Sequence, residues 1–320
     1  MKNILIAGGI TLLLLIGFGI FFYQRQLQSQ STQTSSSNQT TIEKNVIHIG
    51  FTIDEDGLDA NTKEFQPFVD YLASQLQDQG ITAGKLVPAK SFAEMAQLVR
   101  QGKVDVYIDS AFPVFVVNEL AGAKVLANRW KGGVETYHSI IFVKKDGPIK
   151  KLDDLKGKII SFGAPNTTTG YFLPKAELIQ QGYKLTLKQS PTDHVAPDEI
   201  GYIFAGDKIY DNVTNGVTAA GGENEDEVKA FYKDTFPQYT AISKTTDILR
   251  FLVATRSDMS PQLRTKIQTV LVNMDKTPQG QTVLKEFAET ARFTPVSSDD
   301  VAYGEIKKLS NLVEQEIISQ

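Results

Sequence analysis

Three consecutive threonines and a glycine are the residues of this chain best suited to bind a charged group. Thr167, Thr168, Thr169 and Gly170 lie within GAPNTTTGYFLP, residues 163 to 174, between a segment that reads as a strand and one that reads as a helix. The first N–H groups of a helix have no partner inside it and carry a partial positive charge, so they attract anions. Threonine hydroxyls add donors there, and glycine lets the backbone approach a ligand. The segment predicts a site for a small anion and, since no lysine accompanies it, not a nucleotide phosphate loop.

The same segment has a second interpretation. Threonine is a common residue at the N-cap of a helix, so the run could consist of one cap and two solvated neighbours. The four residues alone leave both interpretations open, and the choice between them depends on the rest of the chain.

Acidic residues form further groups of interest. The segment DEDGLDAN, residues 54 to 61, is spaced like part of a calcium loop but lacks the closing glutamate, so we expect a solvated loop. Residues 225 to 227 are all acidic and are expected to stabilise the start of a helix. Glu223 just precedes them. In an anion site this carboxylate would repel a dianion, but it could accept a proton from a monoprotonated oxyanion or pair with an amine, and so select the ligand.

Catalysis and nucleic-acid binding are poorly supported by the composition. The chain has no cysteine, which excludes disulfides, thiolate nucleophiles and cysteine-bound metal. His48, His138 and His194 lie in separate elements and form no metal-binding pair. We therefore expect no catalytic residue, no metal site and no cofactor. A net charge of -4 and a pI near 5.5 also argue against a nucleic-acid partner.

The elements that would position the threonines alternate between strands and helices, which predicts an α/β fold with mainly parallel sheets flanked by helices. The expected strands are residues 46–53, 81–89, 104–110, 137–145, 158–163 and 248–257. The expected helices are residues 64–80, 91–102, 169–182, 225–234 and 260–275, with Ser91 as an N-cap.

The N-terminal region has a different composition. Residues 4 to 23 form an uncharged apolar run, long enough to cross the roughly 30 Å hydrocarbon core of a bilayer. We interpret residues 1–24 as an uncleaved signal anchor, with a cleaved signal peptide as the alternative; in both cases the remaining chain is exported. Residues 25–45 are rich in Gln, Ser, Thr and Asn and are expected to be a flexible linker. Without a cysteine, the chain cannot be anchored as a lipoprotein.

From Val46 to about Leu309 the chain resembles the phosphonate-, phosphite- and phosphate-binding periplasmic proteins of ATP-binding-cassette (ABC) importers. The most specific part of the resemblance is LDDLKGKIISFGAPNTTTGYFLP, in which a proline, a hydroxyl triplet and Gly-Tyr follow a strand in the family's order. Other matching stretches are IHIGF, EFQPFVDYLASQL, GKVDVYIDSAFPVFVVNELAGAKVLA and LVATRSDMSPQLRTKIQTVLVNMDKTPQGQTVLKEF.

The resemblance implies a two-lobed periplasmic-binding-protein fold of type II that closes on its ligand. Lobe 1 would comprise residues 46–136 and 248–320, and lobe 2 residues 137–247. Oxygens of a phosphorus group would bind Thr167, Thr168 and Thr169. Lobe 1 would add aromatic residues, here Phe92 and Phe115, and a loop at Ser110 and Ala111.

Three positions depart from the family pattern and leave the ligand open. Phe92 replaces a tyrosine and so lacks a phenolic donor. Gly206-Asp207 stands where the family has a His-Asp pair, and Glu223 where it has an aspartate.

The resemblance implies an extracytoplasmic binding protein that presents a small anion to an ABC permease and its ATPase. The alternative is a membrane-tethered sensory protein that uses the same fold to report ligand occupancy, and an enzyme is the weakest hypothesis.

Overall fold

The computed structural model describes residues 45–53, 57–231, 233, 238–288 and 290–319, all within one compact unit. The predicted signal anchor and nearly all of the predicted linker lie outside these residues. Among the helices that are described, none is both long and apolar enough to cross a membrane.

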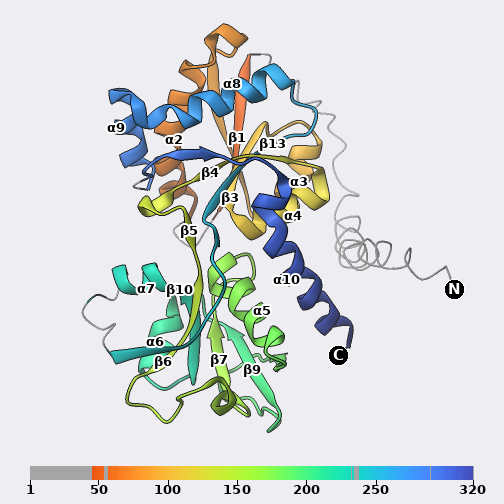
Figure 1. Ribbon diagram of the computed structural model, residues 1–320, viewed down its shortest axis with the longest axis vertical. Helices are drawn as coiled ribbons and strands as arrows, with labels where there is room; N and C mark the ends of the chain where they lie inside the picture. Colours follow the sequence, from red (N-terminus) through yellow and green to blue (C-terminus); the bar gives the residue numbers. More distant parts are fainter. Residues whose placement is uncertain (1–44, 54–56, 232, 234–237, 289, 320) are drawn as a thin grey trace, which may run out of the picture. The chain divides into compact units, whose positions relative to one another are not determined.

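The first of two six-stranded sheets has the strand order β14-β4-β13-β3-β1-β2. Strands β1, β2 and β3 are parallel, while β13 runs antiparallel to β3 and β4, and β14 antiparallel to β4, so the sheet is mixed. The strands are β1 (Val46–Thr52), β2 (Ala83–Ala89), β3 (Val106–Ser110), β4 (Lys124–Arg129), β13 (Phe251–Thr255) and β14 (Phe293–Pro295). The helices packed with them are α2 (Gly57–Ser74), α3 (Phe92–Arg100), α4 (Ala111–Ala121), α8 (Pro261–Val272) and α9 (Pro278–Glu286) (Figure 1).

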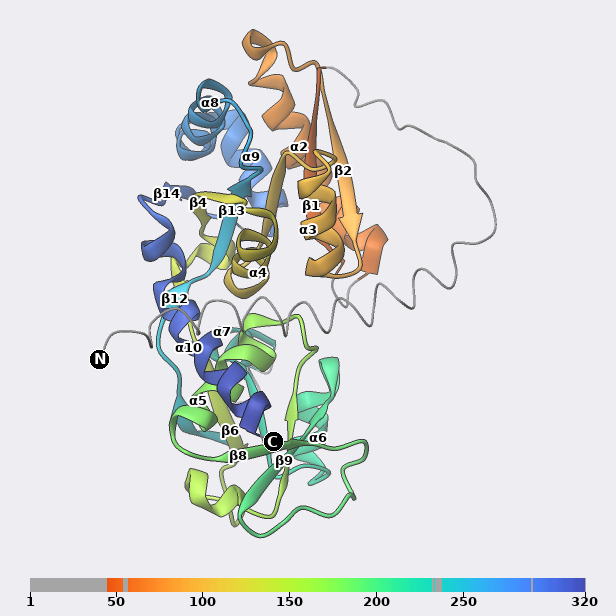
Figure 2. The ribbon, with the colours of Figure 1, turned by 90° about the vertical axis from the view of Figure 1, so that its right-hand side faces the viewer.

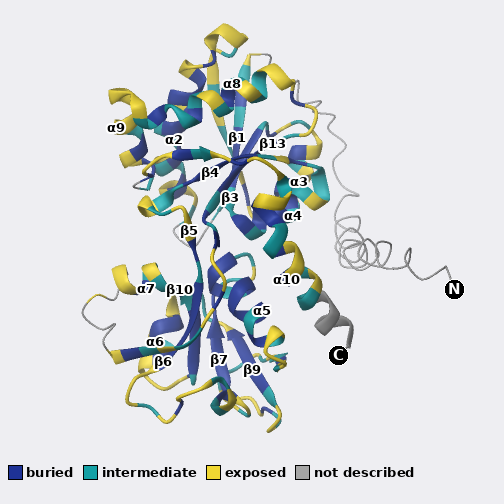
Figure 3. Ribbon diagram, in the orientation of Figure 1, coloured by how far each residue is buried: buried dark blue, intermediate teal, exposed yellow. Residues whose placement is uncertain are grey.

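The second sheet has the order β11-β6-β10-β7-β9-β8. Strands β10, β7, β9 and β8 are parallel, and β6 runs antiparallel to its neighbours β10 and β11. The strands are β6 (Ser139–Lys144), β7 (Ile159–Phe162), β8 (Lys184–Leu187), β9 (Glu199–Phe204), β10 (Ala220–Asn224) and β11 (Tyr239–Lys244), accompanied by the helices α5 (Leu173–Gln180), α6 (Ile209–Thr214) and α7 (Glu225–Phe231). In both sheets the central strands are buried and the outer faces of the helices are exposed (Figure 3).

Two crossovers connect the sheets, one between β4 and β6 and the other between β11 and β13. They pair with each other as a short antiparallel ribbon of β5 (Thr136–Tyr137) and β12 (Ile248–Leu249). The long helix α10 (Asp299–Ser319) packs against both α4 and α5, as Figures 1 and 2 show. The predicted lobe boundaries fall at this ribbon, although the division into two moving lobes stays a prediction.

The segment from residue 57 to residue 61 differs from the expected solvated loop, because α2 already begins at Gly57. Asn61 is buried and stands four residues before Phe65, so the buried stripe of the helix extends one turn further than the apolar residues alone suggested.

Candidate ligand-binding site

The predicted site begins where parallel strands of the second sheet end. The threonine triplet follows β7, the Gly206–Lys208 turn follows β9, and Glu223 lies at the end of β10. The carboxyl ends of neighbouring parallel strands lie at one edge of a sheet, which is where open α/β sheets bind ligands.

The triplet forms an unusual turn of helix. Thr168–Phe172 is π-helical and leads directly into α5; such turns occur frequently at functional sites. Thr167 holds the N-cap position, but its hydroxyl donates to the carbonyl oxygen of Ala164 at 2.8 Å and makes no capping bond. A Cβ atom at Gly170 would lie 2.9 Å from Thr167 Oγ1 and 3.2 Å from Gly163 Cα, so the turn requires glycine there. The cap interpretation of the triplet is therefore not what the geometry shows.

The hydroxyls of the two buried threonines point to different partners. Thr168 Oγ1 donates to Ser110 Oγ at 2.9 Å and accepts from the backbone N–H of Phe112 at 3.1 Å. Thr169 Oγ1 donates to Glu223 Oε1 over a long 3.4 Å, and its carbonyl accepts from Ser139 Oγ at 2.6 Å. Thr168 thus connects the second sheet to the first, whereas Thr169 bonds within the second.

On the first sheet the contact falls at the start of a helix. β3 ends at Ser110 and α4 begins at Ala111, so the structure has a helix start where the family resemblance implied a loop. The N–H group of Phe112 belongs to the first turn of α4 and has no acceptor within the helix, which explains why it donates to the Thr168 hydroxyl oxygen. The triplet and the positive end of α4 therefore meet directly.

Aromatic rings extend this contact. Phe112 stacks on Phe172 with ring centroids 4.1 Å apart and an interplanar angle of 8°. Phe92, the aromatic position implied by the resemblance, packs edge-on against Phe112 at 6.1 Å. The structure thus brings Phe92 to the site through Phe112, a residue that the sequence analysis did not select.

Two other predicted site residues lie elsewhere. Phe115 is buried in the apolar core, where it packs against Tyr303 at 5.7 Å. Asp207 is exposed on the turn before α6, and no hydrogen bond or ion pair joins it to the triplet within the part of the chain that is described. Glu223, in contrast, lies beside Thr169 and Gly170.

Carboxyl groups make the surroundings of the triplet acidic. Glu223 Oε1 accepts from its neighbour's backbone N–H, that of Asn224, at 2.7 Å. Behind Ser110, Asp109 accepts from the Tyr107 hydroxyl at 2.6 Å and from the Ser110 N–H at 2.6 Å. Burial raises the pKa of the Asp109 carboxyl despite these bonds. An anion bound here must therefore tolerate acidic neighbours or carry a compensating proton or cationic group.

A histidine on the first crossover lies between two carboxylates. His138 Nε2 is 2.7 Å from Glu225 Oε2, and its Nδ1 is 2.8 Å from Asp247 Oδ1 on the second crossover. Lys229 Nζ contacts the other oxygen of Glu225 at 2.9 Å. Burial acts to raise the pKa of Glu225, but the hydrogen bonds from Lys229 and His138 outweigh it and hold the pKa below the ordinary value of 4.5.

The lowered pKa of Glu225 predicts a pH effect on stability. Because the folded-state pKa lies below the unfolded one, the ionised group stabilises the fold above pH 4.5, and this contribution is lost as the pH falls through the folded value. We expect His138→Gln to reduce that acid-induced loss in unfolding free energy by about 0.5 kcal/mol.

Urea unfolding at about pH 6 and pH 3 measures the loss of unfolding free energy in each variant, with the exposed His194→Gln as the matched control. Equal losses in the two variants would contradict the pairing.

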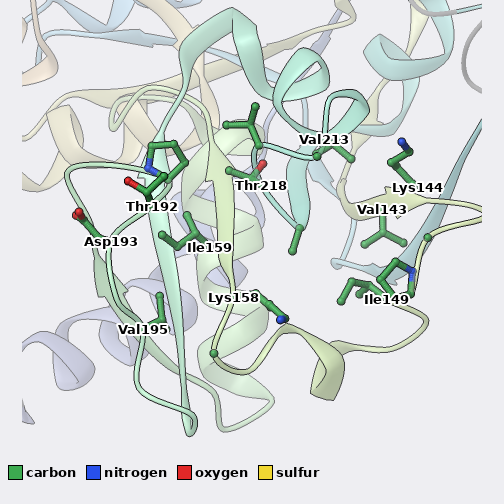
Figure 4. Close-up of a pocket in the computed structure, with 17 residues that line it drawn as sticks. Val143, Lys144, Ile149, Lys158, Ile159, Thr192, Asp193, Val195, Val213 and Thr218 are labelled. Carbon is green, nitrogen blue, oxygen red and sulfur yellow. The ribbon is translucent and has the colours of Figure 1, made fainter.

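A separate cavity of about 400 Å³ opens at the opposite edge of the second sheet (Figure 4). It lies near the start of β7 and the end of β6, and none of the predicted site residues is among the described residues that line it. Its walls are largely apolar and include Val143, Ile149, Ile159, Val195, Val213 and Val217. We therefore do not place the predicted anion there.

Two mixed β-sheets, each flanked by helices and joined to the other by two paired crossovers, form the architecture of the periplasmic binding proteins. The chain belongs to one family within this class: the family model described as "ABC transporter, phosphonate, periplasmic substrate-binding protein" matches residues 50–301. The family is one of binding proteins and not of enzymes.

One curated protein is similar to part of the chain in sequence, and solved structures are similar to it in fold. The chain is 27% identical to the phosphonates-binding periplasmic protein of Escherichia coli K12 over 208 residues, which cover 62% of this chain and 58% of that protein. XAC2383 of Xanthomonas citri, solved bound to ATP, has a similar fold with a TM-score of 0.77 at 23% identity, covering 85% of this chain and 98% of that one. PhnD1 of Prochlorococcus marinus, solved with methylphosphonate, gives a TM-score of 0.63 at 19% identity, with 85% and 99% covered.

Proposed function

We propose that this protein captures a phosphorus oxyanion outside the cytoplasm and presents it to the permease and ATPase subunits of an ABC importer. The ligand is a phosphonate, phosphite or phosphate, held between two lobes that close around it. Oxygens of the ligand bind the π-helical turn at Thr167 to Thr169 and the first turn of α4.

The observation that carries this proposal is the contact of Thr168 with Ser110 and the N–H of Phe112. It joins hydroxyl and backbone donors from two sheets at one point, and the helix α4 adds its positive end. Hydrogen bonds to a charged group contribute about 1.5 to 3 kcal/mol each, and micromolar binding requires about 8 kcal/mol. Several such hydrogen bonds are therefore enough for micromolar binding, even after the entropy lost in ordering the ligand and its donors is subtracted.

The acidic neighbours narrow the form of the ligand. Glu223 already accepts from the Thr169 hydroxyl, so a fully ionised phosphate would meet a carboxylate beside its binding donors. The hydroxyl of a monoprotonated oxyanion can donate a hydrogen bond to Glu223, and an aminophosphonate can direct its ammonium group to it. We propose that Glu223 selects such ligands.

Membership of a periplasmic binding-protein family implies a location outside the cytoplasm. We further propose that the apolar run from Ile4 to Tyr23 anchors the protein in the membrane as an uncleaved helix. The polar residues that follow would then tether the binding domain near the permease.

Calorimetric titration of the full chain in detergent tests the proposed ligand class. Phosphate, phosphite, methylphosphonate and aminoethylphosphonate form the panel, with sulfate as the control anion. We expect micromolar binding of at least one phosphorus compound and none of sulfate. Titrations without heat for all four would refute the phosphorus ligand.

A further inference from the structure

Tyr137 lies on the first crossover, in strand β5, and its side chain is buried with 3% exposed. Its hydroxyl has no hydrogen-bond partner among the residues that the structure describes. Burial raises the pKa of Tyr137 above its ordinary range, while the nearby Thr168 hydroxyl and the charge of Arg250 act in the opposite direction. The phenol therefore stays protonated at neutral pH and keeps an unused O–H donor beside the threonine triplet.

Arg250 lies on the second crossover and is 5% exposed. Its backbone N–H donates to the carbonyl of Glu135 on the first crossover at 3.0 Å, and its guanidinium lies 5.3 Å from the centre of the Tyr137 ring. One nitrogen, Nη2, donates to Glu227 Oε1 at 3.2 Å. Its Nε, however, is buried with no partner in the described part of the chain. The second crossover thus adds a second unused donor and a buried positive charge.

The Tyr137 hydroxyl and Arg250 Nε have the same chemical character, because a phenol O–H and a guanidinium N–H are both hydrogen-bond donors. Leaving a buried donor unpaired costs about 1 to 3 kcal/mol, so a ligand that supplies acceptor oxygens gains affinity here. A cationic or purely apolar ligand would leave both donors unsatisfied. Charges of both signs act on Tyr137: besides burial, the carboxyl groups of Glu227 and Asp109 raise its pKa, whereas the positive charge of Arg250 lowers it.

An unpaired hydroxyl alone does not define a site. Tyr303 on α10 is also buried, and its hydroxyl has no partner among the described residues. It packs within the apolar core against Phe115, and burial, followed by the charges of Asp299 and Glu119, raises its pKa. What distinguishes Tyr137 is that the Thr168 hydroxyl and the Arg250 guanidinium both lie close to it.

We propose that the two crossovers form part of the ligand site, with the Tyr137 hydroxyl and Arg250 Nε donating to oxygens of the anion held at Thr168. This inference rests on the proposed function. It gives the site a phenolic donor, which Phe92 cannot supply. Because both residues lie on the segments that must bend when lobes move, ligand occupancy acts directly on the crossovers.

Titration of Tyr137→Phe with the best phosphorus ligand of the wild-type panel tests the proposal. Phenylalanine removes only the hydroxyl, so we expect about a five- to tenfold weaker affinity. The full-chain variant Tyr303→Phe is the matched control, since it removes an equally buried hydroxyl that packs against Phe115 in the apolar core. The affinity of this control for the ligand should equal that of the wild type. Binding by Tyr137→Phe that matches the wild type would overturn the crossover site and leave the proposed function standing. A wild-type protein that binds none of the panel would overturn both.

A second pair of variants isolates the guanidinium. Arg250→Lys keeps the charge but has no group at the Nε position, and we expect about fivefold weaker binding. Glu227→Gln removes the ion pair of Arg250 while keeping Nε, and it should bind the anion at least as tightly as the wild type. Equal weakening in both variants would assign the effect to the ion pair and overturn the role of Nε.

Discussion

Replacing Arg129 by methionine is expected to lower the free energy of unfolding by about 3 to 5 kcal/mol, because it breaks a buried ionic network. Arg129 is fully buried at the end of β4. Its Nη2 donates to Glu64 Oε1 at 3.0 Å and to the carbonyl of Phe287 at 2.8 Å, and its Nε donates to Thr290 Oγ1 at 2.8 Å. The guanidinium also lies 3.4 Å from the centre of the Phe287 ring.

The cost arises mainly from the groups that methionine would leave behind. Burial lowers the pKa of Arg129 to about 10, which still leaves the side chain charged at neutral pH and available to its partners. Without it, the Glu64 carboxylate and the Thr290 hydroxyl lose the guanidinium as a donor. The Phe287 carbonyl keeps only its bonds from the Thr290 hydroxyl and backbone N–H, and the methionine side chain offers no donor in return.

The unfolding midpoint in urea measures this effect on the full chain. Arg292→Met is the matched control, since Arg292 also stacks on an aromatic ring, that of Trp130 at 3.9 Å, but is exposed. We expect that control to change the free energy by about 0.5 kcal/mol or less. A shift of similar size in both variants would show that the buried network does not stabilise the fold.

The alternation of strands and helices could be predicted because its signals are local. The buried strand Val46–Thr52 is a near-continuous apolar run. The helix Phe92–Arg100 begins at the expected cap, which is confirmed by the bond from the Glu94 N–H to Ser91 Oγ at 3.2 Å. Each signal spans only a few residues, so the chain alone is sufficient to read it.

The contacts across the site could not be predicted in the same way. Thr168 and Ser110 are separated by 58 positions, and no local pattern records that their hydroxyls meet. The sequence placed the threonines at a helix start, but the π-helical turn and the direction of each hydroxyl depend on the packing of the two sheets.

The choice among aromatic residues illustrates a second limit. In AFPVFVVNELA, the sequence of α4, nearly every position of the first two turns is apolar, so helical periodicity does not distinguish Phe112 from Phe115. The resemblance favoured Phe115, whereas Phe112 is the ring at the triplet. Arg250 carried a usable signal, since it is the one charged residue in the apolar run ILRFLVAT. A charge inside such a run is costly to bury and therefore often functional or paired.

Replacing Thr168 by valine is expected to weaken binding of the phosphorus ligand by about ten- to a hundredfold, the loss of one hydrogen bond to a charged group. Valine keeps the size and branching of threonine but has no hydroxyl for Ser110 Oγ and no acceptor for the Phe112 N–H. The substitution therefore removes both the donor offered to the ligand and the bond that joins the π-helical turn to α4.

Thr218→Val is the matched control for this experiment. Thr218 is also buried, and its hydroxyl lies 2.9 Å from Ser161 Oγ, the same separation as that between Thr168 and Ser110. It lines the cavity at the opposite edge of the second sheet, so its loss should leave ligand affinity within about twofold while costing about 1 kcal/mol of stability. Calorimetry measures the affinities and urea unfolding the stabilities of both variants. If Thr168→Val binds the ligand as tightly as Thr218→Val does, the triplet is not part of the site, and the anion must bind elsewhere on the fold.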